Sequence, residues 1–178
     1  GWATSPRSGI SKSYSFTFQF KIDSTAPTMN NVSTSSTGKY TNSSTYVYAS
    51  DSMSGVDAIY MKTPGSSSYG NMGTSTTVSS SGTNGLYSFY AKDKAGNISR
   101  TYFLYLDTVK PTGTIKNSNG AEITGSYTNQ AFSYSATDSG SGISYLQYKK
   151  PGSSSWLTYT SGTSISASAA SGTYQFRS

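Results

Sequence analysis

The feature of this sequence that most constrains its fold is an internal repeat. The octet KTPGSSSY at residues 62–69 returns as KKPGSSSW at 149–156, 87 positions later. Three flanking blocks return with the same spacing: YTN at 40–42 and 127–129, ASDSMSGV at 49–56 against ATDSGSGI at 136–143, and GLYSF at 85–89 against GTYQF at 172–176. DSTAPT at 23–28 matches DTVKPT at 107–112 with a spacing of 84, because the second copy has a longer loop before its YTN. Blocks that recur in one order indicate tandem copies of a single structural unit.

The repeat length and composition favour strands over helices. A unit of about 85 residues is large enough to bury a modest core of its own. Ser, Thr, Tyr and Gly dominate both copies, whereas Leu and Ala are scarce, so strand propensity exceeds helix propensity along the chain. The chain has no Cys, so neither copy holds a disulfide or a thiolate metal site. The expected fold class is all-β.

Comparison of the two copies predicts which side of each strand is buried. Val47 and Ala49 match Tyr134 and Ala136, whereas Tyr46 and Tyr48 match serines at 133 and 135 and should face water. By the same reasoning, one set of positions in each copy is expected to form the core. In the later strands this set is Ile59, Met61, Tyr87 and Phe89 in the first copy and Leu146, Tyr148, Tyr174 and Phe176 in the second. The positions expected outside are Tyr60, Ser88 and Tyr90, which match Gln147, Gln175 and Arg177.

Residues 13–22, SYSFTFQFKI, alternate polar and apolar side chains. Such alternation predicts a half-buried strand with Phe18, Phe20 and Ile22 on its core side. Alignment on Asp23 and Asp107 places this strand opposite residues 101–106, so the two segments should have the same role in successive units.

The repeated octet is expected to close a hairpin. Pro64 presets its own φ, and Gly65 can adopt the positive φ that a type II turn requires. The alternative is a serine-rich loop that contacts a ligand.

Several motifs together resemble the immunoglobulin-like repeats of large bacterial cell-surface and secreted proteins. They are D-x-x-x-P-T at 23–28, A-x-D-x-x-S-G-aliphatic at 49–56, G-x-Y-x-aromatic at 85–89, A-x-D-x-A-G-N-x-S at 91–99, and a last strand that ends in Asp107. The resemblance implies tandem immunoglobulin-like β-sandwiches located outside the cell or on the bacterial surface. Such modules serve as spacers, adhesins and binding units, and they also occur beside catalytic domains of polysaccharide-degrading enzymes.

The expected domain organisation is one tail strand and two units. Residues 1–23 would be the closing strand of a preceding repeat, residues 24–108 a complete repeat, and residues 109–178 a repeat without its final strand. An open sheet edge of this kind invites pairing with another strand. One hypothesis is therefore head-to-tail strand exchange, in which the Phe16/Phe18/Phe20 strand of one molecule fills the second repeat of another. A fragment cut at an inconvenient point is the alternative.

The sequence argues against catalysis, nucleic-acid binding and membrane insertion. It has no His or Cys, and no pair among its acidic residues is marked for glycoside hydrolysis. The acidic residues are Asp23, Asp51, Asp57, Asp93, Asp107, Glu122 and Asp138, and most lie at matching strand ends where carboxylates cap turns. The net charge is +6, but the cations are scattered rather than clustered as a nucleic-acid groove requires. No apolar run is long enough to cross a bilayer.

No cofactor is expected, and calcium is the one metal alternative. Asp51, Asp57 and Asp93 could converge at one end of the first repeat. A dense Asp/Asn loop is absent, and turn capping explains these carboxylates equally well.

The strongest remaining signal is a set of outward aromatic residues in the first repeat. Tyr60, Tyr90, Phe103 and Tyr105 are expected on neighbouring strands of one sheet, all with the outward phase. Flat rings on a sheet suit stacking against sugars. They could instead pack against a loop or an adjoining repeat, or contact a protein partner.

These observations favour a structural spacer or adhesion module of a bacterial extracellular multidomain protein. Its partners would be the other domains of that protein and a host or glycan ligand. The alternative is a carbohydrate-binding accessory module of a secreted polysaccharide-active enzyme.

Overall fold

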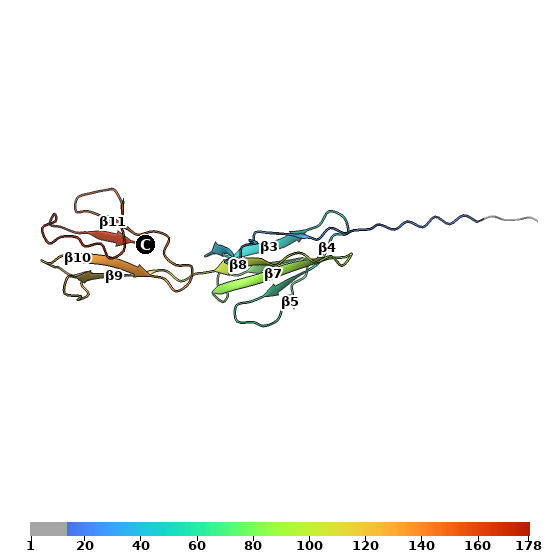
Figure 1. Ribbon diagram of the computed structural model, residues 1–178, viewed down its shortest axis with the longest axis horizontal. Coiled ribbons are helices and arrows are strands. Elements are labelled where there is room, and N and C mark those ends of the chain that lie inside the picture. Colours follow the sequence, from blue (N-terminus) through green and yellow to red (C-terminus); the bar gives the residue numbers. More distant parts are fainter. Residues whose placement is uncertain (1–13) are drawn as a thin grey trace, which may run out of the picture.

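The computed structural model describes residues 14–178, and within them the protein is all-β (Figure 1). The strands are β1 (Thr28–Asn30), β2 (Lys39–Thr41), β3 (Thr45–Ser50), β4 (Val56–Lys62), β5 (Gly70–Asn71), β6 (Ser75–Val78), β7 (Gly85–Asp93), β8 (Tyr102–Leu106), β9 (Thr112–Asn117), β10 (Phe132–Thr137), β11 (Gln147–Lys149), β12 (Leu157–Thr158) and β13 (Gln175–Arg177). Among the described residues there is no helix that is long and apolar enough to cross a membrane.

Strands β1–β8 form two sheets around one core, which we call the first unit. One sheet has the order β1-β3-β6 and the other has the order β2-β8-β7-β4-β5. Within the larger sheet, β2 and β8 run parallel, whereas β7 is antiparallel to both β8 and β4. The buried core takes residues from both sheets: Met29, Val47, Ile59, Val78, Tyr87, Phe89, Ala91, Leu104 and Leu106.

The inward and outward assignments in the first unit are mostly confirmed. Val47, Ile59 and Phe89 are 0% exposed, whereas Tyr46 and Tyr48 are 54% and 39% exposed. Each strand therefore presents its apolar set to the core, as period-two alternation requires.

Ser88 is the exception, because it is buried although it lies on the outer face. It is paired in register with Phe103 on one side and Lys62 on the other. Larger side chains on neighbouring strands therefore shield this small residue, which a reading of one strand at a time cannot detect.

Strands β9–β13 form the second unit, which has a smaller core. β9 pairs with β10, and a separate sheet has the order β12-β11-β13. The buried residues are Tyr134, Leu146 and Tyr159. Tyr148 and Phe176 pack against them but are only partly buried, whereas the matching Phe89 of the first unit is fully enclosed.

Residues 14–22 differ from the sequence prediction, because no sheet includes them and the half-buried strand is not formed. Phe16, Phe18 and Phe20 are 79%, 88% and 84% exposed. Figure 1 shows this segment running away from the first unit as an extended thread. A strand needs a neighbour to bury its apolar side, and among the described residues this segment has none. Ser13 and the rest of the predicted N-terminal strand region, residues 1–13, lie outside the described residues.

The repeated octet closes the same hairpin in both units, as predicted. Ser66 N–H donates to the Thr63 carbonyl at 3.1 Å, and Ser153 N–H donates to the Lys150 carbonyl at 3.1 Å. Gly65 and Gly152 have φ values of 78° and 71°, which is the conformation expected at the third turn position. The turns connect β4 with β5 and β11 with β12.

The turn prolines also explain why the octet recurs together with a later glycine. A Cβ on Gly85 would lie 3.0 Å from Cβ of Pro64, and one on Gly172 would lie 2.7 Å from Cβ of Pro151. Each turn thus packs against the glycine that begins the GxYx-aromatic block, where only glycine leaves room for the proline ring.

Candidate functional site

The outer face of the five-stranded sheet carries the predicted aromatic residues. Tyr60 on β4 pairs with Tyr90 on β7, and β7 in turn aligns Ser88 with Phe103 and Leu86 with Tyr105 on β8. Residues directly opposite or two apart on antiparallel strands share one face. All four predicted residues therefore lie on one surface, and all four are partly exposed.

Three tyrosines form a packed cluster at one end of this face. The rings of Tyr60 and Tyr90 are stacked, with centroids 4.7 Å apart and planes inclined by 10°. Tyr69 meets Tyr90 edge-on at 4.9 Å, and Lys62 Nζ lies 5.4 Å from the Tyr69 ring centroid. Aromatic stacking and cation–π contacts of this kind hold the rings in fixed positions without a polar partner.

The face continues to the opposite edge of the sheet through a second aromatic pair. Tyr40 on β2 lies next to Tyr105 on β8, with ring centroids 5.3 Å apart. Tyr40 is 53% exposed. The surface therefore extends across β4, β7, β8 and β2. We call it the aromatic face: Tyr40, Tyr60, Tyr69, Tyr90, Phe103 and Tyr105.

Sequence reasoning missed Tyr40 and Tyr69 as members of this face. A usable signal was present for both, because each is aromatic in both copies: Tyr40 matches Tyr127, and Tyr69 matches Trp156. Neither lies in a long alternating strand, so periodicity gave no phase for their side chains.

The second unit places a related set of side chains at the same position in its sheet. Gln147 and Arg177 are paired in register, as Tyr60 and Tyr90 are, and the Arg177 Nε donates to Gln147 Oε1 at 2.8 Å. The Arg177 guanidinium lies 4.3 Å from the Trp156 ring centroid, and Lys149 Nζ lies 5.1 Å from it. A lysine therefore lies near an aromatic ring in both units, Lys62 near Tyr69 and Lys149 near Trp156. The neighbouring pair differs, because Tyr60 and Tyr90 are replaced by Gln147 and Arg177.

A group of carboxylates lies at the N-terminal end of the first unit. Carboxylate oxygens of Asp23, Asp51 and Asp93 lie within 4.8 Å of one another. Of the calcium alternative Asp51, Asp57 and Asp93, the structure brings together Asp51 and Asp93, with Asp23 in the place of Asp57. Asp57 has an exposed side chain on β4 outside this group, whereas Asp23 enters it from the end of the extended thread.

Backbone and side-chain N–H groups already occupy these carboxylates. Asp23 accepts from the N–H of Ser54 at 2.9 Å, and Asp51 accepts from Met53 and Gly55. Asp93 accepts from the backbone N–H of Asn97 at 2.7 Å and from its side-chain amide at 2.8 Å. Turn capping, the role that the sequence predicted for Asp51 and Asp93, accounts for these contacts.

The hydrogen bonds also explain the ionisation of three carboxylates. Those from Ser54 and Thr25 hold the pKa of Asp23 below its ordinary value, and those from Ser141 and Val109 do the same for the pKa of Asp107. Burial opposes ionisation of Asp93, but bonds from Asn97 and Gly96 outweigh it and its pKa is also lowered. All three groups are therefore charged at neutral pH.

Asp107 and Asp138 reproduce part of this arrangement in the second unit. Asp107 Oδ2 accepts from Ser141 N–H, and Asp138 accepts from Gly140 and Gly142, each at 2.9 Å. Asp107 follows the last strand of the first unit, so this carboxylate connects one unit with a turn of the next.

Comparison with known proteins gives no family assignment. No family model matches the chain, no curated protein matches it, and no solved structure matches it. The resemblance to immunoglobulin-like repeats therefore stays an expectation that depends on the sequence motifs.

Proposed function

We propose that this chain is a structural spacer and adhesion module of a bacterial extracellular multidomain protein, without catalytic activity. It would consist of tandem immunoglobulin-like repeats whose role is to hold other domains apart and contact a partner. The repeated blocks, the two separate cores and the absence of His and Cys from the sequence all support this function.

The observation that carries the proposal is a junction that occurs twice. Asp23 binds the N–H of Ser54, and Asp107 binds the N–H of Ser141, at equivalent positions of the two units. Each carboxylate lies at the end of an incoming segment and binds a turn of the unit that follows. Hydrogen bonds to a charged acceptor are stronger than neutral ones, so the junction restrains the angle between successive elements. A fixed angle is what a spacer needs.

Single-molecule FRET tests this restraint, because the chain has no native Cys to interfere with labelling. Dyes would be attached through Ser67→Cys and Ser154→Cys, which lie at matching exposed positions in the two hairpin turns. The expected result is a narrow distribution of transfer efficiency that broadens in Asp107→Ala. The control, Asp57→Ala, removes an exposed carboxylate that is not in the junction. A native distribution as broad as that of Asp107→Ala would refute the spacer proposal.

A second function is supported by a separate observation, the aromatic face. Stacked and edge-on tyrosines on a sheet surface could bind the apolar faces of sugar rings, as expected for an accessory module of a polysaccharide-active enzyme. Affinity electrophoresis in gels containing soluble polysaccharides would show retardation of the native protein.

The matched variants for this test are available within the first unit. Tyr60→Ala/Tyr90→Ala should abolish retardation. Tyr46→Ala/Tyr48→Ala should leave it unchanged, because it removes a stacked tyrosine pair from the other sheet. Equal retardation of both double variants would eliminate the aromatic face as the site.

A further inference from the structure

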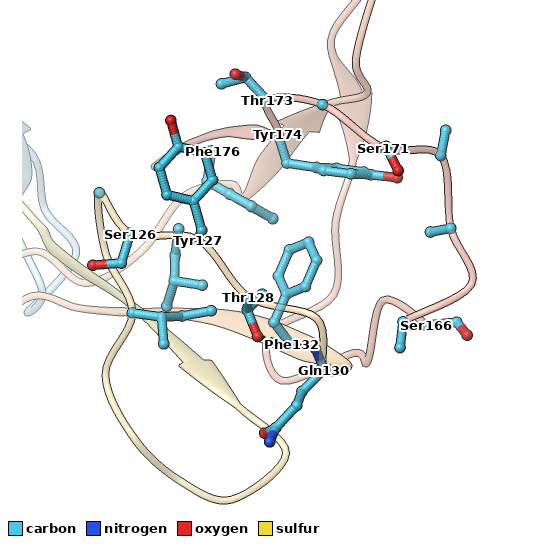
Figure 2. A pocket seen from close by; sticks show the side chains of 17 residues that line it. Ser126, Tyr127, Thr128, Gln130, Phe132, Ser166, Ser171, Thr173, Tyr174 and Phe176 are labelled. Atoms are coloured by element: carbon cyan, nitrogen blue, oxygen red, sulfur yellow. Dashed lines mark hydrogen bonds between the residues drawn. The ribbon is translucent and has the colours of Figure 1, made fainter.

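The second unit contains a groove between residues 125–128 and residues 172–176, lined by both polar and apolar side chains. Its volume is about 560 Å³. Figure 2 shows Phe132 on the lower side of the groove and Tyr174 and Phe176 on its upper side, with Tyr127 beside Phe176. The rest of the apolar lining is Ile115, Ile123, Ala167, Ala169 and Ala170.

The groove occupies the place that β8 occupies in the first unit. There, β8 lies between β2 at 39–41 and the first part of β7 at 85–89. Adding the repeat spacing of 87 converts these segments to 126–128 and 172–176, and both of these segments line the groove. In the first unit this position is filled by Leu104 and Leu106, both 0% exposed.

The second unit lacks such a strand among residues 14–178, and its side chains show the consequence. Tyr127 is 103% exposed, whereas its counterpart Tyr40 packs against Tyr105 of β8. Phe176 is partly exposed, whereas its counterpart Phe89 is fully buried. The groove is therefore shaped for one more strand that carries apolar side chains on alternate positions.

Residues 16–22 have the properties of that strand. They are extended, outside every sheet, and expose Phe16, Phe18, Phe20 and Ile22 by 74% to 88%. Their relation to Asp23 is that of β8 to Asp107, so Phe20 corresponds to Leu104 and Ile22 to Leu106. The intervening polar residues Thr17, Gln19 and Lys21 would face solvent.

We propose that residues 16–22 of one copy of this chain occupy the groove in the second unit of another copy. The register follows from the first unit: the added strand runs antiparallel to β13, with Phe18 opposite Phe176, Phe20 opposite Tyr174 and Ile22 opposite Gly172. Its other edge runs parallel to residues 126–128, as β8 does to β2. Main-chain hydrogen bonds supply affinity and alternate side chains supply register, as in other strand-addition complexes.

The donor is a second copy rather than the same chain, because the thread leaves the first unit at the end remote from the second unit (Figure 1). After donation, Asp23 of the donor follows the added strand as Asp107 follows β8. The contact joins different surfaces of the two copies, so it repeats head to tail, in an open chain or in a ring where the rotation closes.

Site-directed crosslinking tests the register. Gln19 and Gln175 are exposed and would lie opposite each other, at a Cα separation of about 4.5–5.5 Å that a disulfide spans. A Gln19→Cys chain mixed with a Gln175→Cys chain should form the mixed disulfide at least tenfold more than Gln19→Cys mixed with Ser154→Cys. Equal yields from the two mixtures would overturn the proposal.

Association in solution is the second measurement. Light scattering of the native chain should show mass rising with concentration. Phe20→Asp should remove this rise, whereas Gln19→Asp should keep it, because only the first places a charge in the groove. Both residues are exposed in the thread, so neither change affects folding of the two units.

The Tyr60→Ala/Tyr90→Ala variant separates strand exchange from association through the aromatic face and should associate normally. Only monomers at all concentrations, or a rise lost equally in the two charge variants, would refute strand exchange.

Discussion

Truncation of Leu104 should destabilise the first unit selectively. Leu104 lies on β8, is 0% exposed, and belongs to the core shared by the two sheets. Leu104→Ala removes three carbon atoms, which at about 0.8 kcal/mol per buried methylene costs about 2.4 kcal/mol in transfer free energy. The cavity that remains raises the total to about 3–4 kcal/mol. A unit of this size has a free energy of unfolding of roughly 4–13 kcal/mol, so the loss is a large share of it.

Differential scanning calorimetry would resolve this effect. With about 4–8 °C per kcal/mol for a domain of this size, the midpoint of the first unit should fall by roughly 15–25 °C. The transition of the second unit should not move, because its core contains no residue of the first. The control is Leu157→Ala on β12, where the side chain is 42% exposed and the expected change is within about 0.5 kcal/mol. Equal effects of the two substitutions, or one transition that shifts as a whole, would refute the assignment of two independent cores.

Two further predictions concern the repeated carboxylates and glycines. Because the folded-state pKa of Asp107 lies below its ordinary value of 3.8, its contribution to stability is complete above that pH and is lost as pH falls through the folded pKa. Urea unfolding between pH 7 and pH 2 should therefore show a smaller loss of stability at acid pH in Asp107→Asn than in the native protein, with Asp57→Asn unchanged as the control. Gly85→Ala should destabilise the first unit by about 1 kcal/mol or more, since φ is 129° and a Cβ would press on Pro64. Gly65→Ala, next to Pro64 in the turn but with nothing near its Cβ position, should cost less in thermal unfolding, and an equal loss would discount the proline contact.

The buried and exposed faces of the strands could be predicted because the chain contains two copies of the repeat that can be compared position by position. Ser at 133 and 135 identified Tyr46 and Tyr48 as outward, and Tyr46 and Tyr48 are exposed as expected. Burial that depends on a neighbouring strand could not be predicted in this way. Ser88 is buried between strands that place Phe103 and Lys62 opposite it, and the thread at residues 14–22 stays exposed because among the described residues it has no partner.

The candidate sites, too, could be predicted only in part from the sequence. Tyr60, Tyr90, Phe103 and Tyr105 were placed on one face because strand order and phase determine that surface. The carboxylate group depends on loop positions, so the sequence suggested Asp57 where the structure places Asp23 beside Asp51 and Asp93. Asp23 precedes β1 and Asp93 ends β7, so their proximity depends on the three-dimensional arrangement of the strands. The alternation of polar and apolar residues carries no information on that arrangement.

The parallel pairing of β2 with β8 has a mechanical consequence. Lys39–Thr41 lies in the early part of the first unit and Tyr102–Leu106 at its end, so tension that passes β1 and reaches β2 pulls β2 and β8 in opposite directions along their length. Their hydrogen bonds then bear load together instead of opening one after another. The second unit would gain the same clamp only when a strand occupies its groove, so a stretched head-to-tail chain would resist force at every unit except its last.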